Sequence, residues 1–205
     1  MDLKKIIDQL NIDLNNNIIN GKVILNKFRM ITENSRKSSA YYDHRYAPFY
    51  YHLGKYFKPE SFFEIGFNLG LLSGSFLSSC NTVKYFFGYN EVEHDLSLRL
   101  GKSNIKLAFR GQADFYLGKT FDKEFLDKVG ARRWDVILID KKLSYDRSLE
   151  IFEVAWENLK NEGFMFVEHT IDQKTTLTSL KDFLDSKNRT FLNFDTRYGT
   201  AMIQK

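Results

Sequence analysis

The residues best suited to chemistry follow two short apolar runs in the second half of the chain. Asp140 comes directly after the run 136–139, and Glu168 and His169 come directly after the run 164–167. Two carboxylates and an imidazole at neighbouring strand ends could bind Mg²⁺ or Mn²⁺. They could also orient a substrate hydroxyl. We therefore predict a metal site of Asp140, Glu168 and His169, and we count Asp140 and His169 as candidate catalytic residues.

Two lysines beside Asp140 leave other interpretations open. Lys141 and Lys142 could neutralise the carboxylates in place of a metal ion, or they could attract an anionic acceptor. Lys142 is also a candidate catalytic residue, because a lysine whose pKa is lowered by burial can act as a general base. Solvated lysines, and solvated Glu168 and His169, are the alternative without chemistry.

A turn punctuated by glycines follows an earlier apolar run. From Glu64 onward it reads Glu-Ile-Gly-Phe-Asn-Leu-Gly-Leu-Leu-Ser-Gly. Glycine permits a positive φ and a close approach of a ligand, and a following helix offers free N–H groups to an anion. The spacing does not match the Gly-x-Gly-x-x-Gly dinucleotide fingerprint, and the Gly-Lys-Ser/Thr of a P-loop is missing. NAD and ATP are therefore disfavoured.

This turn resembles the first motif of class I S-adenosylmethionine-dependent methyltransferases, where an acid two positions before the first glycine precedes a Gly-x-x-x-Gly loop. The resemblance covers about residues 61–205, and the closing segment 198–203 is similar to the family's reversed last strand. It implies S-adenosyl-L-methionine as cofactor. The residues implied for its amino-acid end are Glu64, Gly66, Phe67, Asn68 and Gly70, and those for its nucleoside end are Asn90, Glu91, Gln112 and Ala113, with Asp140 also counted among the cofactor contacts.

The segment after Asp140 resembles one branch of that family. Asp140, Ser144 and Tyr145 match an Asp-Gly-Asp-His-Ser-Tyr segment of metal-dependent O-methyltransferases and cephalosporin-hydroxylase-like proteins. Lys142 and Leu143 replace the second Asp and the His of that segment. In the branch, two acidic or acid-amide residues after the fifth strand bind a divalent cation together with the fourth-strand Asp, which corresponds to the metal site predicted above.

The resemblance implies methyl transfer to an oxygen or nitrogen of a small or medium-sized acceptor, with or without a divalent metal. A catalytically silent binding or assembly module is the alternative, because Asn90 and Gln112 stand where the family has acids. A second alternative is an enzyme that modifies nucleic acid, with Lys141, Lys142 and aromatic side chains as contacts. A small-molecule acceptor is the favoured partner.

The elements that must position these residues alternate along the chain. Short β-rich runs separated by helical stretches predict an α/β fold of the Rossmann-like, doubly wound type with a mostly parallel sheet. The predicted strands are 62–65, 84–89, 105–109, 135–139 and 164–167, and a helix before the last of these is expected to end at 161–163. Only the turn 195–199 separates the runs 191–194 and 200–203, so a C-terminal antiparallel hairpin is expected.

The first part of the chain predicts a helical cap over residues 1–58, followed by the sheet domain over 59–205 as one compact unit. Helical stretches are expected at 3–14, at 23–31 and from Pro48 to the proline at position 59. The aromatic segment 41–46, with His44, could stack on a substrate, although packing of the cap is the more common role of such residues.

Composition fits a single globular domain. The chain has 205 residues, 43% of them hydrophobic, and a net charge of 30 − 26 = +4 with the charges interspersed, which does not indicate a nucleic-acid partner. A single cysteine, Cys80, excludes an intramolecular disulfide. The N-terminus does not resemble a signal peptide and no apolar run is long enough to span a membrane, so we expect a cytoplasmic protein.

Overall fold

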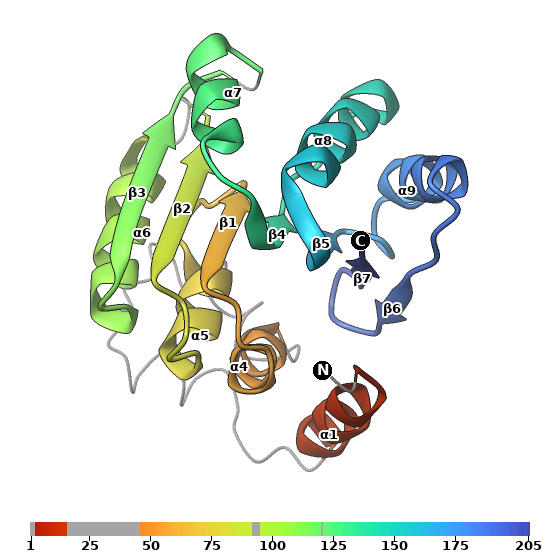
Figure 1. Cartoon of the computed structure of the whole chain (residues 1–205), viewed down its shortest axis with the longest axis horizontal. Coiled ribbons are helices and arrows are strands. Elements are labelled where there is room, and N and C mark those ends of the chain that lie inside the picture. The colour runs from red at the N-terminus through yellow and green to blue at the C-terminus, as the bar shows by residue number, and fades with distance from the viewer. Residues whose placement is uncertain (1–2, 16–45, 92–94, 120) are drawn as a thin grey trace.

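The structure is a computed structural model of the chain, and it describes residues 3–15, 46–91, 95–119 and 121–205. In these residues seven strands form one sheet with the order β3-β2-β1-β4-β5-β7-β6 (Figure 1). The strands are β1 (Ser61–Ile65), β2 (Tyr85–Asn90), β3 (Gln112–Leu117), β4 (Trp134–Ile139), β5 (Leu159–Glu168), β6 (Leu192–Phe194) and β7 (Thr200–Gln204).

The sheet confirms the predicted doubly wound architecture with a C-terminal hairpin. Strand β1 pairs in parallel with β2 on one side and with β4 on the other, so the strand order reverses beside β1. Strand β7 runs antiparallel to β5 and to β6. In open parallel sheets, ligands bind outside the carboxyl ends of the strands at such a reversal. The fold therefore predicts a ligand site at the carboxyl ends of β1, β2 and β4.

Helices cover both faces of the sheet (Figure 1). The helices of the described residues are α1 (Leu3–Asn15), α4 (Tyr46–Tyr56), α5 (Leu71–Ser79), α6 (Asp95–Ala108), α7 (Lys123–Gly130), α8 (Tyr145–Asn158) and α9 (Lys174–Ser186). One buried cluster joins α4, α5 and α6 to the sheet, and a second joins α7, α8 and α9 to its other face. This is the two-faced covering that a buried parallel sheet requires.

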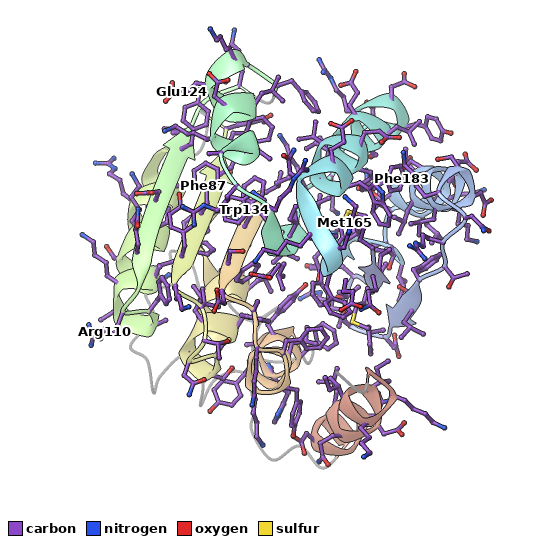
Figure 2. All side chains as sticks on the ribbon, viewed as in Figure 1. Phe87, Arg110, Glu124, Trp134, Met165 and Phe183 are labelled. Carbon is purple, nitrogen blue, oxygen red and sulfur yellow. The ribbon has the colours of Figure 1, made fainter. Side chains whose placement is uncertain are left out.

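The second cluster shows why the chain is rich in aromatic residues. The Phe87 ring stacks at 6.1 Å from the Trp134 ring, and Phe63 lies 5.1 Å from Phe87 and 5.3 Å from Trp134. Figure 2 shows Phe87, Trp134 and Met165 inside the molecule, and Arg110 and Glu124 at its outside. Each large buried ring removes roughly 150–250 Å² from water, which contributes strongly to the stability of the sheet.

The beginning of the chain contributes two described helices. Helix α4 begins at Tyr46, two residues before Pro48, and α1 contacts it through Asp13, whose carboxylate accepts a hydrogen bond from the Tyr56 hydroxyl. The predicted helix at 23–31 and the aromatic residues 41–45, His44 included, lie outside the described residues.

Two element boundaries predicted from the sequence are wrong. The run 105–109 is not a strand, because Ile105 is the buried face of α6 and the third strand is β3, which begins at Gln112. The edge strand β3 is half-exposed and gives little apolar signal. The fifth strand begins at Leu159, so the segment 161–163 lies inside β5 and does not end a helix.

Within the described ranges, no helix combines the length and the apolar character that crossing a membrane requires.

Candidate functional site

The turn after β1 closes directly against the end of β4. Gly66 has φ 93°, and a side chain at this position would overlap the backbone oxygen of Asp140. The backbone N–H of Gly66 donates to the Tyr89 oxygen at 3.0 Å, and the N–H of Asp140 donates to the Ile65 oxygen at 2.8 Å. Only glycine satisfies both the conformation and the close approach. The turn and the β4 end are therefore one rigid unit.

Glu64 lies beneath this turn with 1% of its surface exposed. Its carboxylate accepts a hydrogen bond from the Ser73 hydroxyl of α5. Burial raises the pKa of the Glu64 carboxyl well above its usual range; the Ser73 hydrogen bond opposes this, and the negative charges of Asp140 and Glu168 add to it. A positively charged ligand group next to Glu64 would lower this pKa.

The other predicted residues of the turn are fixed by their surroundings. The Phe67 ring is buried, 5.6 Å from the Phe86 ring and 5.2 Å from the Phe115 ring, so a ligand could meet only its backbone. Asn68 has φ 43° and is partly exposed, and Gly70, with φ 62°, begins α5 as its N-cap.

Asn104 holds this turn from the side of α6, although the sequence analysis did not single it out. Its side-chain nitrogen donates to the Leu69 oxygen at 2.8 Å, and the residue is fully buried. An asparagine on the buried face of an amphipathic helix is the sequence signal that could have indicated it.

At the end of β2 the structure leaves one polar atom without a partner. Asn90 is 5% exposed, and its Nδ2 atom makes no hydrogen bond within the described part of the chain. A buried donor without an acceptor costs about 1–3 kcal/mol. Register pairing places Ile65 opposite Tyr89, so Asn90 lies level with Gly66, where the turn begins. Glu91 follows, and its carboxylate pairs with Lys141.

Gln112 and Ala113 are not part of this region, and their predicted role at the cofactor is wrong. They begin β3, where Gln112 pairs with Tyr85, the first residue of β2. Because the strands are parallel, both residues lie at the opposite edge of the sheet from Gly66. The misplaced third strand caused this error; the residues that follow the carboxyl end of β3 are Gly118 and Lys119.

Asp140 and His169, both predicted to be catalytic, are in contact. His169 Nε2 lies 3.2 Å from Asp140 Oδ1, and His169 Nδ1 lies 2.9 Å from Asp172 Oδ1. Burial lowers the pKa of the His169 imidazole, but the hydrogen bonds and negative charges of Asp140 and Asp172 outweigh it and leave this pKa above its ordinary value. His169 also has φ 67°, a conformation that a residue other than glycine adopts at a cost.

Asp172 extends this arrangement to Lys142, and sequence reasoning missed it. Lys142 Nζ lies 2.7 Å from Asp172 Oδ2. Burial raises the pKa of Asp172, yet the hydrogen bonds from Lys142 and His169 and their charges leave it below its ordinary value. Asp140, His169, Asp172 and Lys142 therefore form one continuous row, which we call the acid-imidazole row. An acid three residues after a histidine was the available sequence signal.

The C-terminal hairpin holds the loop that carries His169. The N–H of Ile171 donates to the Tyr198 oxygen at 2.8 Å, and the N–H of Thr170 donates to the Gly199 oxygen at 3.3 Å. The His169 ring lies 5.0 Å from the Tyr198 ring. The turn between β6 and β7 thus fixes the position of His169.

Glu168 has a different place from the one predicted. It is fully buried, and its Oε1 atom accepts hydrogen bonds from the Tyr50 hydroxyl of α4 and, at 2.8 Å, from the Thr200 hydroxyl. Strand β5 ends at Glu168, and His169 follows it with φ 67° and contacts Asp140 and Asp172 instead of Tyr50 and Thr200. No three His, Cys, Asp or Glu side chains of the described residues are placed to hold a metal ion. The predicted set of Asp140, Glu168 and His169 does not fit a metal site.

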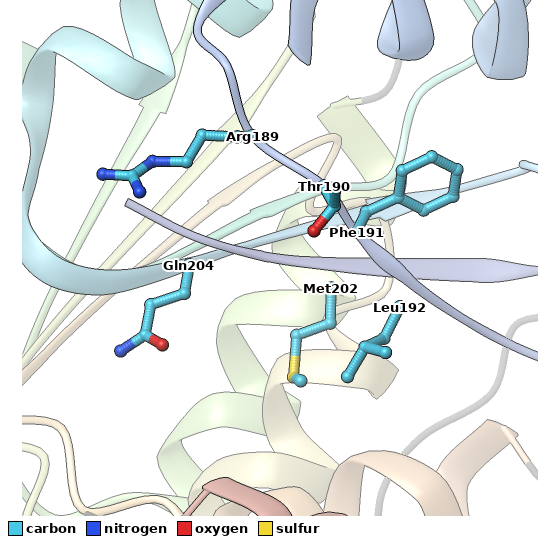
Figure 3. A pocket seen from close by; sticks show the side chains of 6 residues that line it. All are labelled: Arg189, Thr190, Phe191, Leu192, Met202 and Gln204. Carbon is cyan, nitrogen blue, oxygen red and sulfur yellow. The ribbon is translucent and has the colours of Figure 1, made fainter. Parts of the chain in front are cut away.

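Two pockets lie away from these residues. One pocket, of about 230 Å³, lies beside the hairpin of β6 and β7 (Figure 3). It is lined by Arg189, Thr190, Phe191, Leu192, Met202 and Gln204. The other, of about 340 Å³, lies where α5 and α6 end. Neither is lined by a residue of the predicted site.

Solved structures show what the chain is similar to. A methyltransferase from Geobacter sulfurreducens is 12% identical with a TM-score of 0.67, covering 97% of this chain and 96% of its own. The O-methyltransferase from Bacillus cereus, solved in complex with SAH, is 12% identical with a TM-score of 0.61, covering 95% and 97%. The O-methyltransferase TomG from Streptomyces achromogenes, solved with SAM, is 11% identical with a TM-score of 0.60, covering 88% and 85%.

No protein-family model matches the sequence, and no curated protein matches it. At identities of 11–12%, the likeness to the solved structures establishes a class I methyltransferase fold.

Proposed function

We propose that the chain is an S-adenosylmethionine-dependent O-methyltransferase that acts on a small hydroxyl-bearing acceptor. The observation that carries the proposal is the meeting of three features at the reversal of strand order: the Gly66 turn, the buried unpartnered Nδ2 of Asn90, and the Asp140–His169 pair. The fold supports it, since similarly folded O-methyltransferases have been solved with SAH or SAM.

The residues present fit this cofactor. S-adenosylmethionine supplies a methyl group on a positively charged sulfur, together with an ammonium group and ribose hydroxyls. Glu64 and the backbone of the Gly66 turn would hold the amino-acid end, where a cation would meet a buried carboxyl. Asn90 Nδ2 would donate to a ribose oxygen, which removes the cost of leaving it without a partner. Glu91 would accept from a ribose hydroxyl.

In this proposal, Asp140 receives the acceptor. Its carboxylate would accept a hydrogen bond from the acceptor hydroxyl and would take the hydroxyl proton during methyl transfer. His169 keeps Asp140 in position through the 3.2 Å contact with Oδ1, and its N–H dipole stabilises the negative charge that develops nearby. Alignment of the acceptor oxygen with the methyl carbon would supply most of the rate acceleration.

The charges around the site favour an acceptor without an anionic group. Lys141 pairs with Glu91, and Lys142 pairs with Asp172. Both lysines are thereby compensated inside the protein, which disfavours a phosphorylated acceptor or a nucleic acid. A screen of phenols and catechols against their phosphorylated counterparts tests this part of the proposal.

The first experiment is a calorimetric titration with S-adenosylhomocysteine. We expect micromolar binding, about −8 kcal/mol, to the unaltered chain. Gly66→Ala should abolish binding, because a methyl group there overlaps the Asp140 backbone. Gly130→Ala is the matched control: Gly130 ends α7, a Cβ there would meet only Asn158 Oδ1 at 3.9 Å, and the variant should bind as the unaltered chain does. Absence of binding to the folded, unaltered chain would refute the proposed function.

A further inference from the structure

The acid-imidazole row occupies the place where the related metal-dependent branch would be expected to hold a cation. Both nitrogens of His169 face carboxylates, Nε2 toward Asp140 at 3.2 Å and Nδ1 toward Asp172 at 2.9 Å. A metal ion would need the lone pair of one ring nitrogen. In this structure each of the two nitrogens is already directed at a carboxylate oxygen of the protein.

Glu168, the third predicted metal ligand, has other hydrogen-bond partners. Glu168 Oε1 receives two hydroxyl donors, from Tyr50 and from Thr200, on the face of the sheet covered by α4. Turning this carboxylate toward Asp140 would break both of these buried hydrogen bonds.

The acid-imidazole row can perform the two roles that a metal ion would have at this site. A metal ion would orient Asp140 and place positive charge next to the developing oxyanion. His169 does the first through its contact with Asp140, and its N–H dipole contributes the second. Only 12% of the His169 side chain and 16% of the Asp140 side chain are exposed, so their contact is weakly screened by water.

We propose that this chain transfers the methyl group without a divalent metal ion, with His169 in place of the cation and Asp172 as the positioning residue that fixes the His169 ring. The inference rests on the proposed function. The inference gives Asp172 a role in the reaction. It also distinguishes this chain from the metal-dependent branch that its Asp140 segment resembles.

The first test needs no acceptor. Chelator-treated protein saturated with S-adenosylhomocysteine is titrated with Mn²⁺ alone and followed by electron paramagnetic resonance. We expect the signal of free Mn²⁺ to persist at millimolar concentration. Stoichiometric binding that is lost in Asp140→Asn would overturn the inference while leaving the proposed function intact.

The second test measures turnover once the screen has provided an acceptor. Activity should change less than about twofold after treatment with EDTA. A loss that Mg²⁺ or Mn²⁺ restores would overturn the inference. Failure to bind S-adenosylhomocysteine would instead refute the proposed function, so the two failures are distinguishable.

The third test addresses Asp172. Asp172→Asn should lower kcat about 10–100-fold while leaving KM for the cofactor unchanged. Asp182→Asn is the matched control, because Asp182 accepts a 2.7 Å hydrogen bond from the Tyr145 hydroxyl of α8 and does not belong to the row. Equal kcat for both variants would overturn the positioning role.

A spectroscopic signature separates positioning from general stability. The chain has 4 histidines, so ¹⁵N-histidine labelling gives few signals, and His169→Gln identifies those of His169. We expect a low-field Nδ1–H proton that moves upfield in Asp172→Asn and is unchanged in Asp182→Asn. An unmoved signal in Asp172→Asn would contradict the hydrogen bond on which the role depends.

Discussion

The carboxyl groups at the two ends of strands β1 and β4 have pKa values shifted in opposite directions. At the amino end, Asp135 Oδ2 accepts from the backbone and hydroxyl of Ser61 at 2.9 and 2.8 Å, and Oδ1 pairs with Lys160 at 2.8 Å. Burial raises the pKa of Asp135, but the hydrogen bonds from Lys160 and Ser61 leave it below its ordinary value. At the carboxyl end, burial raises the pKa of Glu64.

In the proposed function, this difference separates a carboxylate that stabilises the fold from one that binds a ligand. The carboxylate at the amino end finds its donors inside the protein, so its charge stabilises the fold. The carboxyl at the other end is buried among further acids, and a cationic ligand would complete its surroundings. Four predictions test this contrast.

The largest effect is expected from the same substitution at the two ends of β4. Asp140→Asn should lower kcat by about 10²–10⁴-fold, because it removes the proton acceptor. Asp135→Asn should leave the kcat of the folded protein unchanged. Steady-state kinetics on both variants provide the measurement, and unchanged turnover in Asp140→Asn would remove Asp140 from the mechanism.

The free energy of unfolding, in contrast to kcat, should depend on Asp135. Asp135→Asn should lower the free energy of unfolding by about 2 kcal/mol, because hydrogen bonds to a charged group are lost. The folded-state pKa of Asp135 lies below the unfolded value of about 3.9, so its contribution is complete above that pH and is lost as the pH falls through the folded value. Urea titrations between pH 3 and pH 7 should show this acid loss in the unaltered chain and less of it in Asp135→Asn.

Glu64 should show the reverse pH dependence. Its folded-state pKa lies above the unfolded value of about 4.3, so its contribution to stability is present below that pH and is lost as the pH rises through the folded value. Glu64→Gln keeps a neutral hydrogen-bonding group beside Ser73 and should make the unliganded protein about 1 kcal/mol more stable at pH 7. It should also weaken S-adenosylhomocysteine binding; a variant that is less stable and binds normally would contradict the assignment.

The smallest effect is expected at Asn90. Asn90→Ala should weaken S-adenosylhomocysteine binding about 5–10-fold, the value of one hydrogen bond, and should not lower the melting temperature of the unliganded protein, because Nδ2 has no partner among the described residues. Asn104→Ala, which loses the bond to the Leu69 oxygen, should lower that temperature. Equal losses in both variants would show that Asn90 is structural.

The features predicted well from the sequence are those encoded by neighbouring residues. The Glu64–Gly70 turn and Asp140 follow apolar strands directly, so their position at strand ends could be predicted from local pattern. The hairpin was predictable because the turn 195–199 leaves no room for a helix.

The features that could not be predicted depend on contacts between distant segments. Asp172 becomes significant only because Lys142, on another loop, meets it. Glu168 lies at the predicted strand end, and the alternation of side chains along β5 could have indicated that it points to the face covered by α4. Gln112 was misplaced because the buried face of α6 at Ile105 supplies the same apolar residues as a short strand.

The buried ring of Phe67 has a consequence for how substitutions combine. A Cβ at Gly88 would lie 3.0 Å from Phe67 Cγ, and one at Gly101 would overlap the same ring. Alanine at Gly88 should therefore be harmful alone and be rescued by Phe67→Leu in the same chain. Alanine at Gly101 would also meet the backbone oxygen of Asn68 at 2.7 Å, so the same second substitution should not rescue it. Positions 67 on the turn and 88 on β2 thus form one unit of second-site suppression, within which residue sizes must change together.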